Sequence, residues 1–130
     1  MKVIGLIPTR LNSTRLPQKA LLKINDIPLV VHTYKRAKLA KKLNDVYICC
    51  DDKKIKDVVE KFGAKVIMTS KNHLNGTERI NEAYKKLNKK YDFIVDIQGD
   101  EPLFDPKSIQ ELITFHKKNN HYDIVVPSIK

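Results

Sequence analysis

Residues 2–19 read Lys-Val-Ile-Gly-Leu-Ile-Pro-Thr-Arg-Leu-Asn-Ser-Thr-Arg-Leu-Pro-Gln-Lys. The part from Lys2 to Pro8 is a short run rich in Val, Ile and Leu, which predicts a buried strand. From Thr9 to Ile27 no hydrophobic period is sustained, so a long, polar, basic loop is expected. The chain therefore begins with a core strand that leads into a polar loop.

Apolar runs and helical periods alternate along the rest of the chain. The expected strands are 46–50, 64–68, 93–97 and 122–129, and the expected helices are 28–42, 53–62, 77–88 and 105–118. Pro28 and Pro106 each suit a first helical turn. Asp51-Asp52 and Asp105 suit N-caps. This strict alternation predicts an α/β fold with a Rossmann-like, mostly parallel sheet covered by helices on both faces.

The predicted topology also indicates where a ligand would bind. In an open parallel sheet, ligands bind beyond the carboxyl ends of the strands. Three loops with unusual residues leave such ends: Pro8 to Lys19, Thr69 to Arg79, and Gln98 to Pro102. We expect these three loops to converge on one site.

Length and composition limit the class of protein. The 130 residues suffice for one domain, and 42% hydrophobic with 31% charged residues is typical of a soluble globular chain. No stretch approaches the roughly 18 apolar residues of a membrane span, so no membrane partner is expected. The N-terminus reads as a core strand and not as a signal peptide, which makes the cytoplasm the expected compartment.

The net charge of +10 raises the question of nucleic acid. Of the 25 basic residues, 21 are Lys and only four are Arg, and many lysines form pairs on expected helix exteriors. Nucleic-acid surfaces favour arginine with interleaved aromatic residues, so solvated helix faces are the preferred interpretation. The adjacent Cys49 and Cys50 should point to opposite faces of a strand, which predicts two buried thiols and neither a disulfide nor a zinc site.

The first loop carries three cations, Arg10, Arg15 and Lys19, with the hydroxyls of Ser13 and Thr14 between them. Arginine forks match phosphate oxygens and lysine adds a point charge, so this inventory suits a triphosphate. The glycine pattern of a Walker loop is absent. The alternative is an ordinary basic surface loop.

The second loop ends in Gly76-Thr77-Glu78-Arg79 at a helix start. Gly76 permits a close approach to a ligand, and Thr77 is the expected helix cap. Arg79 is unfavourable in a first turn, because the helix N-terminus already carries partial positive charge. A polar or anionic ligand would relieve that conflict, and an outward-pointing surface arginine is the alternative.

The third loop begins after the buried strand that ends near Ile97. Asp100 follows a glycine there, which is a common position for a carboxylate that holds Mg²⁺ on nucleotide phosphates. Asp96 lies inside the strand, and its direction stays open. Glu101 is more often structural.

Taken together, the motifs closely resemble those of the 3-deoxy-manno-octulosonate cytidylyltransferase (CMP-Kdo synthetase) family. That family shows Pro-Ala-Arg, Ser-Thr-Arg-Leu-Pro-Gly-Lys, His-x-Ser-Gly-Thr-Glu/Asp-Arg and Gln-Gly-Asp-Glu-Pro. The matching segments here are Pro8 to Arg10, Ser13 to Lys19, His73 to Arg79 and Gln98 to Pro102. The resemblance covers essentially the whole chain in ordered motifs at compatible spacings.

The resemblance implies a nucleotide-diphospho-sugar transferase fold and a nucleotidyltransferase activity. CMP would pass from CTP to a 3-deoxy-octulosonate-type sugar acid with release of pyrophosphate, for lipopolysaccharide or capsule synthesis. Mg²⁺ would be the cofactor, and CTP and the acidic sugar the partners. The implied catalytic residues are Arg10, Lys19 and Asp100, with Asp100 as the metal ligand. The implied nucleotide-binding residues are Pro8, Arg10, Ser13, Arg15, Lys19, His73, Gly76, Thr77, Arg79 and Gln98.

The chain also departs from the family pattern. Gln18 stands where the family has glycine, and Asn75 where it has serine. The family is considerably longer, and its second half supplies most sugar contacts, a second Mg²⁺ aspartate and much of the dimer interface. Residues 1–130 are therefore expected to be a truncated, nucleotide-binding part that retains nucleotide binding, with weak or no transfer and without the family's homodimer.

Other functions stay open at this point. The nearest is a cytidylyltransferase for another acidic sugar, amino-Kdo or sialic-acid-like, although sialic-acid enzymes usually carry a Gly-Gly-Ser-Lys type of loop. A metal-dependent glycosyltransferase would show Asp-x-Asp after the fourth strand, and Asp96 and Asp100 are too far apart for that. An inactive nucleotide-binding fragment and a basic nucleic-acid-binding domain are the alternatives from other classes.

Overall fold

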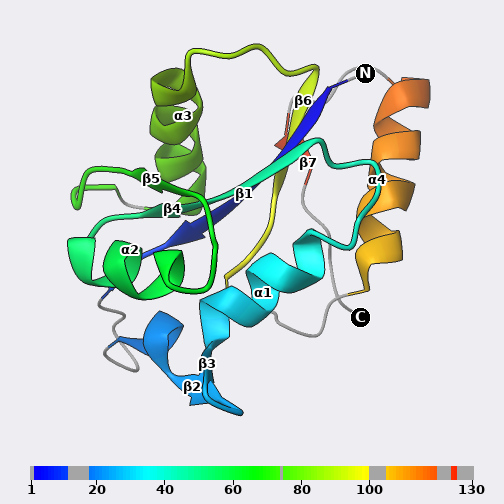
Figure 1. The fold of residues 1–130 in the computed structure, drawn as a ribbon. Coiled ribbons are helices and arrows are strands. Elements are labelled where there is room, and N and C mark those ends of the chain that lie inside the picture. The colour runs from blue at the N-terminus through cyan, green and yellow to red at the C-terminus, as the bar shows by residue number, and fades with distance from the viewer. Residues whose placement is uncertain (1, 12–17, 74, 100–104, 120–123, 126–130) are drawn as a thin grey trace.

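A five-stranded sheet organises the chain (Figure 1). The computed structural model describes residues 2–11, 18–73, 75–99, 105–119 and 124–125. Its strands are β1 (Val3–Thr9), β4 (Asp45–Cys50), β5 (Val66–Met68), β6 (Phe93–Asp96) and β7 (Ile124–Val125). They lie in the order β5-β4-β1-β6-β7, and every pairing is parallel. β1 lies at the centre and later strands add on both of its sides, which confirms the expected Rossmann-like α/β fold with a parallel sheet.

Helices cover both faces of this sheet, as expected from its parallel strands. One face packs against α1 (Leu29–Ala37), α2 (Lys53–Glu60) and α4 (Pro106–Asn119), and the other against α3 (Gly76–Leu87). Figure 1 shows α3 on the opposite side of the strands from α1. Within the described ranges, no helix combines the length and the apolar character that a membrane crossing requires.

The two cysteines divide between these two cores, as the alternation of strand side chains predicts. Cys49 packs with the α3 face and Cys50 with the opposite face, and both are free and buried. Burial raises the pKa of the Cys50 thiol to about 11 and that of Cys49 further. Both thiols therefore stay protonated and serve as small apolar side chains.

The caps of α2 and α4 follow the prediction. The carboxylate of Asp52 accepts the Lys54 amide at 2.8 Å, and that of Asp105 accepts the Lys107 amide at 2.9 Å. Gly63, at φ 83°, follows α2 in the left-handed region that glycine favours.

The expected extent of the first helix, 28–42, is wrong. α1 ends at Ala37, and the next residues form tight turns in which Leu39 and Ala40 donate to carbonyls only three residues back. Leu39 is left 61% exposed. Leu39 fits the helical spacing of apolar residues, so the predicted helix ran past its true end. A sequence pattern does not show which apolar residues are buried.

The long loop expected over residues 9–27 contains short elements that the sequence analysis missed. A 3-10 helix, η1 (Lys19–Leu21), is followed by a hairpin of β2 (Lys23–Ile24) and β3 (Ile27–Pro28). Its two-residue turn, Asn25-Asp26, has φ of 52° and 65°. Positive φ at both positions is the signature of a type I′ turn, for which Asn and Asp are favoured residues.

His32 of α1 fixes this hairpin to the body of the protein. Its Nε2 lies 2.7 Å from the carbonyl oxygen of Ile24, and the side chain is only partly buried. His32 therefore bridges a helix and a surface hairpin.

Gln18, which replaces the family glycine, adopts φ 57° and ψ 31° immediately before η1. Left-handed backbone costs a non-glycine residue roughly 1–2 kcal/mol, which explains a glycine at this position. Here the Gln18 side-chain oxygen also accepts a hydrogen bond from Lys54 Nζ at 2.7 Å. The family glycine is therefore accounted for by backbone geometry.

This geometry leads to a stability prediction. Gln18→Gly and Gln18→Ala both lose the contact with Lys54, but only glycine relieves the left-handed strain. We expect Gln18→Gly to be more stable than Gln18→Ala by about 1 kcal/mol in urea denaturation. Equal stability of the two variants would contradict the strained geometry.

Candidate functional site

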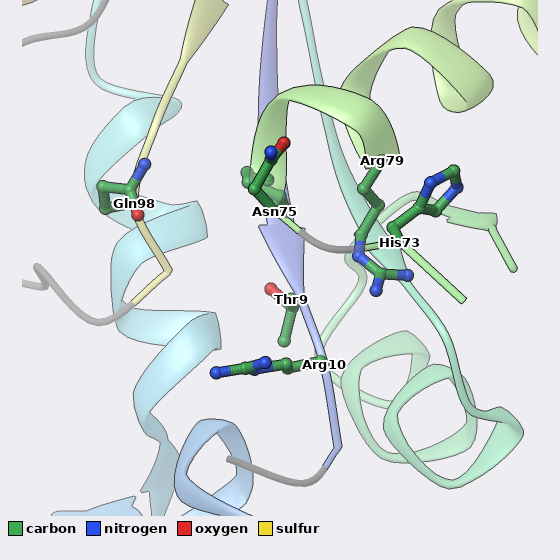
Figure 2. A pocket seen from close by; sticks show the side chains of 8 residues that line it. Thr9, Arg10, His73, Asn75, Arg79 and Gln98 are labelled. Carbon is green, nitrogen blue, oxygen red and sulfur yellow. The ribbon is translucent and has the colours of Figure 1, made fainter. Parts of the chain in front are cut away.

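A cavity of about 240 Å³ lies at the carboxyl end of β1, below the N-terminus of α3 (Figure 2). The described residues that line it are Pro8, Thr9, Arg10, His73, Asn75, Gly76, Arg79 and Gln98. They come from all three predicted loops, which therefore converge as the topology required.

The cavity gathers most, but not all, of the predicted nucleotide-binding residues. Those in its lining are Pro8, Arg10, His73, Gly76, Arg79 and Gln98. Lys19 in η1 and Thr77 on the exposed side of α3 are not part of the lining. Ser13, Arg15 and the predicted metal ligand Asp100 lie outside the described residues. That any of these residues binds a nucleotide stays a prediction.

The cavity wall is cationic. Two arginines and a histidine contribute to it, and none of its described residues is acidic. Figure 2 shows Arg10 extending toward the side of Gln98, whereas Arg79 and His73 lie on the other side of Thr9. A wall of this composition suits an anionic ligand, because guanidinium groups match the geometry of phosphate and carboxylate oxygens.

Two glycines allow the loops to approach the end of β1. A Cβ on Gly76 would lie 3.1 Å from Pro8 Cγ, and one on Gly99 would lie 3.1 Å from Thr9 Oγ1. The carbonyl of Gly99 also accepts a hydrogen bond at 2.9 Å from Thr33 Oγ1 of α1. The absence of a side chain at both positions therefore brings the second and third loops against the first.

Arg79 is held by the protein itself. Its side chain is 5% exposed, and its Nη2 lies 3.8 Å from Asp51 Oδ2. Its Nη1 donates to Thr69 Oγ1 at 2.6 Å and to the Ser70 carbonyl at 2.9 Å. Of the two sequence interpretations, the surface arginine is wrong, and the positive charge that was expected to need a ligand already has an internal partner.

Asp51 is a site residue that the sequence analysis missed. Besides its ion pair with Arg79, its Oδ1 accepts the backbone amide of Leu11 at 2.9 Å. One carboxylate thus joins the first residues of the first loop to the side chain that anchors the second. The sequence offered only a capping role for the Asp51-Asp52 pair, and Asp52 alone fulfils that role.

The helix cap predicted at Thr77 is also wrong. The N-cap of α3 is Asn75, whose Oδ1 accepts the Glu78 amide at 3.0 Å. Both residues can cap a helix, so the choice depended on where the chain turns. Asn75 therefore has a structural role in addition to its place in the cavity wall.

The side chain of Asp96, whose direction the sequence left open, points into the interior. It is 4% exposed and lies beside Leu6 in the sheet, on the face that α3 covers. Burial raises its pKa to about 6. Its Oδ1 accepts a hydrogen bond at 3.3 Å from Nε2 of Gln98, which lines the cavity.

The described residues contain no group of three or more His, Cys, Asp or Glu side chains that could hold a metal ion. A metal at this site would therefore need ligands from elsewhere, such as phosphate oxygens and the undescribed Asp100.

Comparisons with known proteins support the family that the motifs indicated. A family model described as cytidylyltransferase matches residues 4–130. A relative from Shewanella sp. (strain W3-18-1), named 8-amino-3,8-dideoxy-manno-octulosonate cytidylyltransferase, is 49% identical over 119 residues. The match covers 91% of this chain and 49% of the relative, so the chain spans about half the length of the curated relatives it matches.

Solved structures agree with this finding. A CMP:2-keto-3-deoxy-manno-octonic acid synthetase complexed with CTP superposes with a TM-score of 0.88 and 34% identity, over 93% of this chain and 49% of that chain. A cytidylyltransferase from Leptospira borgpetersenii serovar Hardjo-bovis (strain JB197) gives a TM-score of 0.79 and 32% identity, over 93% and 51%. The resemblance inferred from the motifs is confirmed.

The Asp51–Arg79 pair leads to a stability prediction. Asp51→Asn would leave a buried guanidinium without its anion, and we expect it to lower the free energy of unfolding by about 3 kcal/mol. Asp52→Asn, at the neighbouring acid, is the matched control and should have a clearly smaller effect, because Asp52 has no buried guanidinium to neutralise and Asn also caps helices well. Equal losses in urea denaturation would contradict the role of Asp51.

Asp96 leads to a prediction of pH dependence. Its folded-state pKa of about 6 exceeds the ordinary value of 3.8, so the folded protein holds this proton more tightly than the unfolded chain. The contribution of Asp96 to stability therefore falls as pH rises from about 4 to about 6. Asp96→Asn should stabilise the fold by up to about 3 kcal/mol at pH 8 and by little at pH 4.

The measurement is urea denaturation of the parent and the variant across this pH range. The exposed Asp57→Asn serves as a control for the loss of one acidic residue. A gain for Asp96→Asn that is the same at pH 4 and pH 8 would contradict the assignment to a buried carboxylate.

Proposed function

Because the chain belongs to the cytidylyltransferase family, we propose that it forms the CTP-binding part of an enzyme that transfers CMP from CTP to a 3-deoxy-octulosonate-type sugar acid and releases pyrophosphate. The observation that carries this proposal is the cationic cavity at the carboxyl end of β1, to which three separate loops contribute. The exposed Arg10, in a wall with no described acid, suits an anionic ligand such as a nucleoside triphosphate.

In the proposed reaction, the anomeric hydroxyl oxygen of the sugar acid forms a bond to the α-phosphorus of CTP. The bond from that phosphorus to the bridging oxygen of the β-phosphate breaks, pyrophosphate leaves, and the hydroxyl loses its proton. Catalysis of this kind consists mainly of positioning and charge neutralisation. The position of Arg10 in the cavity lining and its exposure support such a role for this residue.

The roles of the other predicted residues form part of the proposal. Lys19, Ser13 and Arg15 would complete the grip on the triphosphate with Arg10. Gly76, Thr77, Arg79 and Gln98 would contact the cytidine, with His73 at the edge of its pocket. Gly76, Gln98 and His73 already meet in one cavity wall, and Arg79 stiffens that wall through its bonds to the loop before α3.

Mg²⁺ is the cofactor of the proposed reaction. It usually keeps several waters and takes few protein ligands beside the substrate phosphates, so a single carboxylate, Asp100, would suffice on this part of the enzyme. When bound, the ion would neutralise charge that develops on the transferring phosphoryl group. The chain's own arginines would orient the same phosphates.

The sugar acid is proposed at two levels. The class, a 3-deoxy-octulosonate, rests on both the Shewanella relative and the solved synthetase. The 8-amino form is a second candidate, because the curated relative named for that sugar is 49% identical, against 34% for the solved synthetase. Either product would supply lipopolysaccharide or capsule synthesis.

Calorimetric titration of the chain tests the nucleotide part of this proposal. We expect CTP to bind more tightly than UTP, ATP or GTP, and binding to strengthen with Mg²⁺. Arg10→Ala should weaken CTP binding about tenfold or more, because it removes a charge-assisted contact. Lys38→Ala, on the far end of α1, is the control for the loss of one positive charge.

Three results would contradict the proposal. One is binding of a short DNA duplex without preference for CTP among the nucleotides. Another is a CTP affinity that Arg10→Ala leaves unchanged, and the third is an equal loss in Lys38→Ala.

A further inference from the structure

A single carboxylate on α3 collects contacts from the loop that precedes this helix. Oε1 of Glu82 lies 2.9 Å from the backbone nitrogen of Ser70 and 2.6 Å from Nε2 of His73. Oε2 lies 2.9 Å from Nζ of Lys86, one turn further along the helix. Glu82 is outside the cavity lining, and no motif of the sequence pointed to it.

These contacts fix both ends of the loop between β5 and α3. Ser70 is near its start and His73 near its end, and both donate to the same oxygen. The carbonyl of Ser70 in turn accepts from Arg79 Nη1 at 2.9 Å. Arg79 and Glu82 lie one turn apart on α3, and both hold this loop. Arg79 donates a hydrogen bond to it, and Glu82 accepts hydrogen bonds from it.

The carboxylate also determines how His73 presents its ring. Glu82 stays ionised near neutral pH, because the Ser70 amide, Lys86 and His73 lower its pKa to about 2. An ionised carboxylate only accepts hydrogen bonds, so Nε2 of His73 must carry a proton. His73 is 18% exposed and lines the cavity, so Glu82 determines which ring nitrogen of His73 carries a proton in the cavity wall.

We propose that Glu82 is a positioning residue for the nucleotide: through Ser70 and His73 it holds the loop before α3 as one wall of the binding cavity. This inference rests on the proposed function, since it concerns the wall that would contact CTP. Glu82 does not itself touch the ligand. Its contribution is the orientation of His73 and the position of the loop backbone at Ser70.

The test compares CTP affinities by calorimetry in the presence of Mg²⁺. Glu82→Met keeps the length and the helix propensity of the side chain but removes both acceptors, and we expect CTP binding to weaken about tenfold or more. Glu82→Gln keeps one neutral oxygen for Ser70 and His73, so it should weaken binding by a smaller factor, about threefold. Lys86→Met removes the ion pair with Glu82 and a hydrogen bond to the Met68 carbonyl but keeps the contacts of Glu82 with Ser70 and His73, so it should bind CTP like the parent.

A double-mutant cycle separates positioning from a merely structural role. His73→Ala should weaken CTP binding, and Glu82→Met should then cause a clearly smaller further loss than it does in the parent. A structural role would lower the melting temperature and leave the two losses of CTP affinity additive.

The outcomes distinguish this inference from the function on which it rests. If the parent binds no CTP, the proposed function fails and the positioning role fails with it. If the parent binds CTP and Glu82→Met binds equally well, or if the two losses add, only the positioning role is overturned. Should Glu82→Met fail to fold, Glu82→Gln decides, and parental affinity in that variant would overturn the role.

Discussion

A guanidinium group buried at the edge of a sheet must have an anion beside it, and the carboxylate of Asp51 meets that requirement for Arg79. Because the same carboxylate accepts the Leu11 amide, the need to neutralise one buried charge also fixes where the chain leaves β1. The first loop and the second loop are thereby held in relation to each other by a residue at the end of β4. The geometry of the cavity between them depends on this single group.

The parallel sheet provides the setting for that interaction. Its carboxyl ends bring together segments that are far apart in sequence, and glycine at 76 and 99 lets them approach within contact of Pro8 and Thr9. The surrounding helices then secure each segment: Thr33 holds the third loop, and Asn75 and Glu82 hold the second. The site is assembled from anchors that lie mostly outside it.

The sequence predicted the parts of this arrangement that depend on local patterns. Apolar runs indicated the strands, and their alternation with helices indicated a parallel sheet whose carboxyl edge would hold the cavity. Asp52 and Asp105 were recognisable as caps because a cap acts on amides two residues away. The roles of Asp51 and Glu82 at the site could not be predicted, because their partners, Leu11 and His73, become neighbours only in the folded chain. The cap of α3 was predicted wrongly for a related reason. Both Asn75 and Thr77 can cap a helix, and the tertiary structure determines at which residue the helix begins.

The internal pairing of Arg79 also bears on how an anion would lie in the cavity. Arg79 is paired with Asp51 at 3.8 Å, whereas Arg10 is exposed and extends toward the side of Gln98, away from Arg79 and His73 (Figure 2). The cationic attraction is therefore concentrated at one end of the cavity, and the hydrogen-bonding groups of the loop before α3 form the other. Within the proposed function, this asymmetry favours contact of the phosphates with Arg10, because among the described lining residues Arg10 is the exposed arginine, whereas Arg79 is buried beside Asp51.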